Sequence, residues 1–204
     1  MSTRYELVGR THQKQRTRQA LVAAARELVA QGVTPTVDAS AARASISRTT
    51  AYRYFPNQRT LLVSAHPEID ARSLLPENPP DDAEDRLDIV VKTFLRIIVD
   101  TEQQQRTMLR LSLESDPSLR GELPLRQGRA IGWIVEALSP LRDRMSAARL
   151  RRLAIAIRSA AGIEPLVWLT DIAGLSREDA VQVMRQSARA LLRLALADSH
   201  ADLE

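Results

Sequence analysis

The sequence lacks cysteine and is poor in histidine and aromatic residues. Without cysteine, its 204 residues can form no disulfide, thiolate metal site, iron–sulfur cluster or cysteine nucleophile. The three histidines (His12, His66 and His200) are far apart and have no metal-ligand spacing. No glycine-rich phosphate loop is present either. We therefore expect no enzyme, no metal site and no cofactor.

Long apolar segments are also missing. No uninterrupted apolar run approaches the ~18–20 residues that a membrane-spanning helix needs. The beginning of the sequence, MSTRYELVGRTHQKQR, contains no apolar stretch like that of a secretory signal. These absences predict a cytoplasmic protein with no membrane partner.

Aromatic residues make up 3% of the chain, whereas Ala, Leu and Arg are abundant. This composition favours helices over strands, and we predict an all-α protein of about nine to ten helices. Helices are expected over 14–31, 37–44, 48–54, 58–65, 83–102, 104–115, 122–138, 147–173 and from residue 177 onward. The stretch LLPENPPDD (74–82) marks a connection between domains. We predict a flexible basic arm (1–13), a three-helix head (14–66) and a larger C-terminal helical bundle (67–204).

The head has the layout of a helix-turn-helix. Thr36 is a good N-cap for the first short helix, and Asp38 in its first turn complements the helix dipole. A tight turn at Ser45 leads to a second short helix, 48–54, which Ser47 caps. Two short helices across a turn of about three residues form a helix-turn-helix.

The charge of the chain is concentrated in the head. Residues 1–66 contain ten Lys/Arg and three Asp/Glu, a net charge of +7, whereas residues 67–204 contain 19 and 22, a net charge of −3. A basic head on a slightly acidic body is expected where only the head meets a polyanion. Basic N-terminal segments are also common as solubility tails, so charge alone favours nucleic acid only modestly.

The second short helix carries side chains suited to DNA. A helix of about two turns fits the major groove, and its exposed face is predicted to hold Arg48, Thr49, Tyr52 and Arg53. Arg48 can donate two hydrogen bonds to guanine O6 and N7, and Thr49 can contact a thymine. Tyr52 and Tyr54 could instead be partly buried packing residues, and Arg53 could be a solvated side chain.

Several motifs of the head occur together. The sequence Ala24-Ala25-Arg26-Glu27-Leu28 precedes Gly32, Thr36-Val37 precede Ala41 and Ala44, and residues 47–56 read SRTTAYRYFP. This combination resembles the DNA-binding head of the TetR family of transcriptional regulators. The resemblance implies that Thr36, Thr50, Tyr52 and Tyr54 contact phosphates, which set the register of a protein on DNA. The predicted DNA-binding residues are Thr36, Ser47, Arg48, Thr49, Thr50, Tyr52, Arg53, Tyr54 and Gln58.

Three positions depart from the family pattern. Ser45 occupies the turn position that is usually Gly, so its backbone must avoid positive φ or tolerate strain. Ser40 occupies an aliphatic core position, and Gln58 replaces a frequent lysine. Gln58 can donate a hydrogen bond but brings no charge.

The larger bundle is expected to mediate dimerisation and ligand binding. One recognition helix reads too few base pairs to be selective, which predicts a homodimer on double-stranded operator DNA. By resemblance, the last two helices pair with those of the partner, and the candidate interface residues are Ala180, Val183, Met184, Ser187 and Leu191. Resemblance also implies a cavity for a small-molecule effector, with candidate lining residues Phe94, Met108, Leu111, Trp133, Ile157 and Trp168. Both sets could instead belong to the intramolecular core.

The functional hypothesis is a ligand-responsive, sequence-specific transcriptional regulator. We expect a repressor that a small-molecule inducer releases from DNA, because most members of the family are repressors. The alternative is a helical ligand-binding or scaffold dimer whose DNA-binding motif has lost its function, which the departures at Ser40, Ser45 and Gln58 favour slightly.

Overall fold

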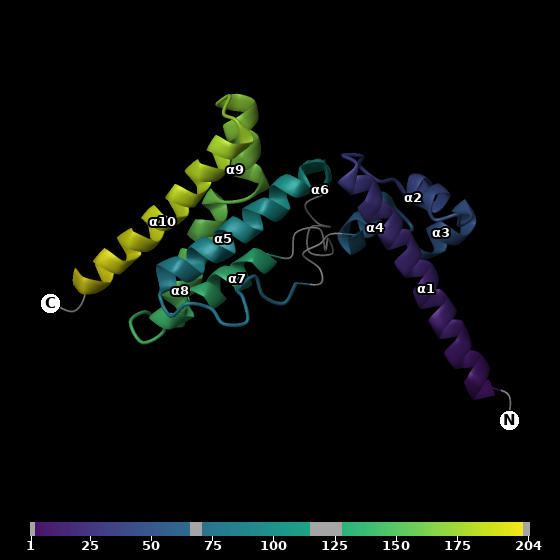
Figure 1. Ribbon diagram of the computed structural model, residues 1–204, viewed down its shortest axis with the longest axis horizontal. Coiled ribbons are helices and arrows are strands. Elements are labelled where there is room, and N and C mark those ends of the chain that lie inside the picture. The colour runs from purple at the N-terminus through teal and green to yellow at the C-terminus, as the bar shows by residue number, and fades with distance from the viewer. Residues whose placement is uncertain (1–2, 66–70, 115–127, 202–204) are drawn as a thin grey trace. The chain divides into compact units, whose positions relative to one another are not determined.

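A computed structural model describes residues 3–65, 71–114 and 128–201 of the chain (Figure 1). Over these residues the protein is helical and contains no strand, which confirms the predicted all-α class of about nine to ten helices. The chain divides into two compact units. The first unit comprises residues 1–69 with 103–125, and the second comprises residues 70–102 with 126–204.

The first unit contains the predicted head. Its helices are α1 (Thr3–Ala30), α2 (Val37–Arg43), α3 (Arg48–Tyr54) and α4 (Gln58–Ala65), together with most of α6 (Glu102–Glu114). The short helices α2, α3 and α4 begin within one residue of their predicted starts because their caps form. Thr36 accepts a hydrogen bond from the backbone N–H of Ala39, Ser47 from that of Thr50, and Asn57 from that of Thr60.

Two features of the first unit differ from the predicted boundaries. Helix α1 begins at Thr3, so residues 3–13 are helical where a flexible arm was predicted, and Figure 1 shows this part of α1 projecting beyond α2, α3 and α4. These residues contain no proline and a single glycine. One glycine destabilises the interior of a helix by only about 1 kcal/mol, so it does not end the helix. Helix α6 packs with the head because Met108 contacts Leu62 and the Gln104 amide donates to the Leu62 carbonyl oxygen over 2.8 Å.

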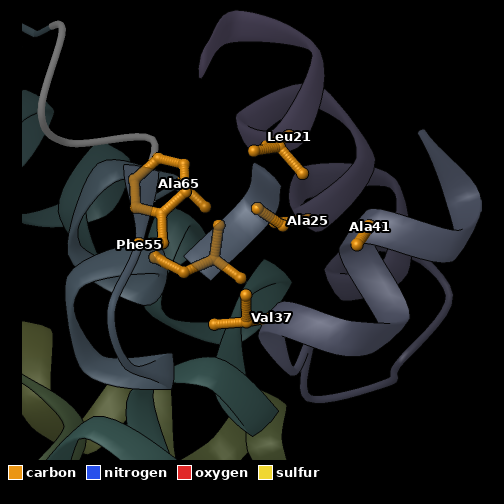
Figure 2. Packing of buried hydrophobic residues seen from close by; sticks show 8 residues of the cluster. Leu21, Ala25, Val37, Ala41, Phe55 and Ala65 are labelled. Atoms are coloured by element: carbon orange, nitrogen blue, oxygen red, sulfur yellow. The ribbon is translucent and has the colours of Figure 1, made fainter. Parts of the chain in front are cut away.

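Eight buried side chains form the core of the head (Figure 2). Each of the four head helices contributes, and Phe55 fills the space after the last turn of α3. Four of the eight residues are alanines, which allow close approach of the helices. The core residues are Leu21, Ala25, Val37, Ala41, Ala51, Phe55, Leu61 and Ala65. Ala51 and Phe55 therefore belong to the buried side of the motif.

The second unit is a helical bundle. It contains α5 (Ala83–Asp100), α7 (Arg129–Ala137), α8 (Ala147–Ala160), α9 (Ile163–Val167) and α10 (Arg177–Ala201), with the short segments η4 (Ser139–Leu141) and η5 (Trp168–Ile172). Helix α10 lies along α5 and α8 and buries the stripe Ala180, Met184, Ala188 and Leu192 (Figure 1). Residues 122–127 of the helix predicted over 122–138 lie outside the described residues.

Ion pairs connect α10 to α5 on the same chain. Arg193 pairs with Glu84 over 2.6 Å, and both Arg185 and Arg189 pair with Asp88 over 2.8 and 3.0 Å. The hydrogen bond and the charge of Glu84 raise the pKa of Arg193 above its ordinary value. These ion pairs hold the side of α10 that carries the three arginines against α5 of the same chain.

One segment of the described chain, 147–172, is long and apolar enough by length and composition to cross a membrane. Its helix is interrupted after Ala160, because Gly162 adopts φ 156°, a conformation that essentially only glycine tolerates. Leu150, Ala154 and Ile157 on its first part are buried in the bundle. The first part of the segment therefore contributes to the core of the second unit.

Candidate nucleic-acid interface

The turn between α2 and α3 is a Schellman motif with serine at the position that glycine usually occupies. The backbone N–H of Ile46 donates to the carbonyl oxygen of Ala41 over 2.9 Å, and that of Ser45 donates to Ala42 over 3.2 Å. Ser45 has φ 54°, in the left-handed region that disfavours residues with a Cβ. The sequence left open whether Ser45 avoids positive φ or tolerates strain. The structure shows that Ser45 has a positive φ, so the turn is strained.

One face of α3 is exposed and the opposite face is buried. The exposed side chains are those of Arg48, Thr49, Tyr52 and Arg53, and Ala51 is completely buried. Tyr52 retains 43% of its accessible surface, so its side chain is partly buried but still reaches the surface. Arg53 has no ion-pair or hydrogen-bond partner among the described residues.

Arg48 differs from Arg53 because it has a partner on the preceding helix. Its Nε donates to Oδ1 of Asp38 over 2.9 Å, and its Nη2 donates to Oδ2 over 2.7 Å. The side chain of Arg48 remains 74% exposed. From sequence, Asp38 was expected only to complement the helix dipole. Its contact with Arg48 joins residues ten positions apart, on two helices separated by a turn, so local sequence spacing does not reveal it.

Three of the predicted DNA-binding residues also stabilise the motif. The Thr36 hydroxyl caps α2, and the Ser47 hydroxyl caps α3 while donating to the Thr50 hydroxyl over 2.9 Å. Thr36 and Ser47 are exposed and Thr50 is half-buried, so their oxygens lie at or near the surface. Tyr54 is half-buried and packs against the head core, as the packing alternative for this residue anticipated.

Other polar residues of the head form intramolecular contacts. The amide of Gln58 donates to the carbonyl oxygen of Pro35 over 3.0 Å, which ties the start of α4 to the loop before α2. Arg18 on α1 donates to the Ser64 hydroxyl over 2.8 Å, and its guanidinium lies 5.3 Å from the centre of the Phe55 ring. The structure thus gives both side chains a packing role within the head.

The six predicted pocket residues do not all meet. Phe94, Trp133 and Ile157 are buried in the second unit, where the rings of Phe94 and Trp133 have centroids 6.3 Å apart. Met108 is buried in the first unit instead, and Trp168 is 58% exposed on η5. The side chain of Leu111 lies outside the described part of the structure.

A charged residue adjoins the aromatic pair of the second unit. The guanidinium of Arg158 lies 5.5 Å from the centre of the Phe94 ring and pairs with Glu164 over 3.3 Å. A separate surface groove of about 610 Å³ lies between α5 and α10, and none of the six predicted residues lines it.

The predicted dimer residues fall on two sides of α10. Ala180 and Met184 are buried in their own chain, so they are not available to a partner. Both residues belong to the stripe of α10 that packs on α5 and α8. A single sequence cannot distinguish such a core stripe from a stripe that faces a partner chain. Val183 is 37% exposed, whereas Ser187 and Leu191 are half-buried. Leu194 on α10 and Ile155 on α8, which are not among the predicted interface residues, are exposed at 61% and 45%.

Comparison with known proteins finds no family model and no curated protein that matches this chain.

Proposed function

We propose that the chain is a dimeric, TetR-like transcriptional regulator that reads operator DNA with α3. The observation that carries the proposal is the exposed face of α3, where Arg48, Thr49, Tyr52 and Arg53 project from a segment with a net charge of +7. Arginine, hydroxyl and phenol groups are those that DNA-binding proteins use on bases and phosphates. A capped seven-residue helix has the length to enter the major groove.

Dimerisation in this proposal uses the free side of α8 and α10. Val183, Ala190 and Leu194 form an exposed, largely apolar stripe on α10, and Ile155 is exposed on α8. The ion pairs to α5 and the buried stripe hold the other side of α10 against its own chain. A symmetric pair of chains joined through this stripe would present two copies of α3 to successive half-sites.

Effector binding in this proposal takes place in the second unit, near Phe94 and Trp133. A ligand releases the protein from DNA only if it prefers the conformation in which the two heads are wrongly spaced. Operator DNA must then weaken ligand binding by the same factor. In a Trp168→Phe chain, Trp133 is the single tryptophan, so a change in its fluorescence on adding a candidate compound reports binding at this place.

The test of DNA binding is a gel shift with the DNA upstream of the chain's own coding sequence, in excess non-specific competitor. The parent chain is expected to give a specific shift that the Arg48→Ala, Tyr52→Ala double variant abolishes. Both side chains are exposed, so the double variant is expected to keep its fold. Arg142→Ala, which removes an exposed arginine from the second unit, is the matched control and should leave the shift unchanged.

If the double variant shifts the DNA as well as the parent does, α3 is not the recognition helix. If neither chain distinguishes this DNA or a pool of random duplexes from competitor, the alternative of a helical ligand-binding or scaffold dimer replaces the proposal.

A further inference from the structure

The arginine at the start of α3 is held by a carboxylate of α2. Arg48 directs its Nε and one Nη2 hydrogen to the two oxygens of Asp38, at 2.9 and 2.7 Å. This two-point geometry restricts the plane and the direction of the guanidinium, which a single contact would not do. The pair is at the surface, with 74% of the Arg48 side chain and 39% of the Asp38 side chain exposed.

The contact leaves one edge of the guanidinium free. A guanidinium has five N–H groups, and Asp38 occupies the side formed by Nε and Nη2. One hydrogen on Nη2 and both hydrogens on Nη1 remain free to donate. Nη1 and Nη2 together form the outer end of the guanidinium. This outer end is able to donate to guanine O6 and N7 together.

We propose that Asp38 is a specificity-determining residue, which positions Arg48 so that its free end reads a guanine. This inference rests on the proposed DNA-binding function. Asp38 touches neither base nor phosphate in this account, and acts only through Arg48.

The physical reason is the competition between bases and phosphates for an exposed arginine. A free arginine at the edge of the major groove can turn to a phosphate oxygen, which gives affinity without sequence information. The carboxylate of Asp38 restricts that freedom, because turning Arg48 to the strand would leave the carboxylate unpaired beside the negatively charged phosphates. Restricting the side chain before binding also reduces the entropy that is lost when the base contact forms.

This reasoning separates specificity from affinity. In Asp38→Ala, Arg48 is free to contact a phosphate, and the head loses one negative charge. We therefore expect binding to non-specific duplex DNA to stay the same or to increase. Preference for guanine at one position should fall by about 5- to 150-fold, the ratio that corresponds to the 1–3 kcal/mol of a bidentate arginine–guanine contact.

The experiment selects binding sites from a pool of random duplexes with the full chain and compares base preference at every position. The variants are Asp38→Ala, Asp38→Asn, Arg48→Ala and the double variant Asp38→Ala, Arg48→Ala. Arg48→Ala should lose preference at one guanine in each half-site. Asp38→Ala should lose it at the same position and at no other, and Asp38→Asn, which keeps one carbonyl oxygen and the size of the side chain, should lose less.

A matched control exists within the same unit. Glu27 pairs with Arg43 over 2.6 Å between α1 and α2, so Glu27→Ala removes an arginine's carboxylate partner and one negative charge without touching Arg48. Glu27→Ala should leave the base preference unchanged. In the Arg48→Ala background, Asp38→Ala should have no further effect on base preference, which a general disturbance of the fold would not reproduce.

The outcomes are distinct. If Asp38→Ala and Asp38→Asn keep the parent's guanine preference while Arg48→Ala loses it, the inference about Asp38 is overturned and the proposed function stands. If both Asp38 variants raise affinity for all sequences and keep the preference, Asp38 only neutralises Arg48, and the inference fails. If the parent enriches no sequence, the proposed function fails and the inference fails with it.

Discussion

The hydroxyl of Ser40 provides the sharpest test of packing in the head. Ser40 is completely buried on α2, and its Oγ has no hydrogen-bond partner among the residues that the structure describes. A buried hydroxyl without a partner costs roughly 1–3 kcal/mol relative to a solvated one. Ser40→Ala removes this cost, and alanine also has a higher helix propensity, by at most about 0.7 kcal/mol.

The loss of one oxygen leaves a small void that offsets part of this gain. We therefore expect Ser40→Ala to stabilise the first unit by about 1–2 kcal/mol. For a unit of this size, such a gain corresponds to a rise in melting temperature of about 5–10 °C.

The two units can be followed separately in one unfolding experiment. The tyrosines (Tyr5, Tyr52 and Tyr54) all lie in the first unit, and both tryptophans (Trp133 and Trp168) lie in the second. Second-derivative tyrosine absorbance should report the shift in Ser40→Ala, whereas tryptophan fluorescence should change little.

Ser64→Ala is the matched control for Ser40→Ala. Ser64 is half-buried and accepts a hydrogen bond from Arg18 over 2.8 Å, so its loss should destabilise the same unit by about 0.5–1.5 kcal/mol. The reasoning is refuted if Ser40→Ala lowers the tyrosine-detected melting temperature, because the hydroxyl must then have a partner.

Three further predictions follow from single positions. Ser45→Gly should stabilise the first unit by about 0.5–1 kcal/mol in urea unfolding, because glycine adopts φ 54° without the left-handed cost, although it loses more chain entropy; no gain would show that the turn is not strained. Gly162→Ala should destabilise the second unit by about 1–3 kcal/mol, because alanine at φ 156° is strained and its Cβ would displace the Arg158 guanidinium from its contact with Glu164; an unchanged tryptophan-detected transition would contradict this. Val183→Glu with Leu194→Glu should convert dimers to monomers in sedimentation velocity, whereas Val33→Glu, at an exposed apolar position of the first unit, should not; an intact dimer in the first variant would place the interface elsewhere.

Most of the local structure of the head could be predicted from its sequence. The caps at Thr36 and Ser47 and the buried side of α3 depend on contacts within a few residues, and such contacts are visible in sequence spacing. The pair between Asp38 and Arg48 was missed because two helices must first be packed at a particular angle. The same holds for Gln58, whose partner is the carbonyl oxygen of Pro35, 23 residues earlier.

The bundle was less predictable because its helices have apolar residues on more than one side. The stripe of α10 that contains Ala180 and Met184 and the stripe that contains Val183 and Leu194 look alike in sequence, and only packing shows that the first is buried. Trp168 was a candidate lining residue of the cavity that the resemblance implies, yet it is exposed on η5, beyond the break at Gly162.

Hydroxyl-radical footprinting of a duplex selected by the full chain tests the central claim most directly. Two chains that each insert α3 into the major groove should protect two half-sites whose centres are about one helical turn, roughly 10 base pairs, apart. The Arg48→Ala, Tyr52→Ala variant should lose this protection. A single unpaired footprint, or protection that survives in the variant, would contradict the account.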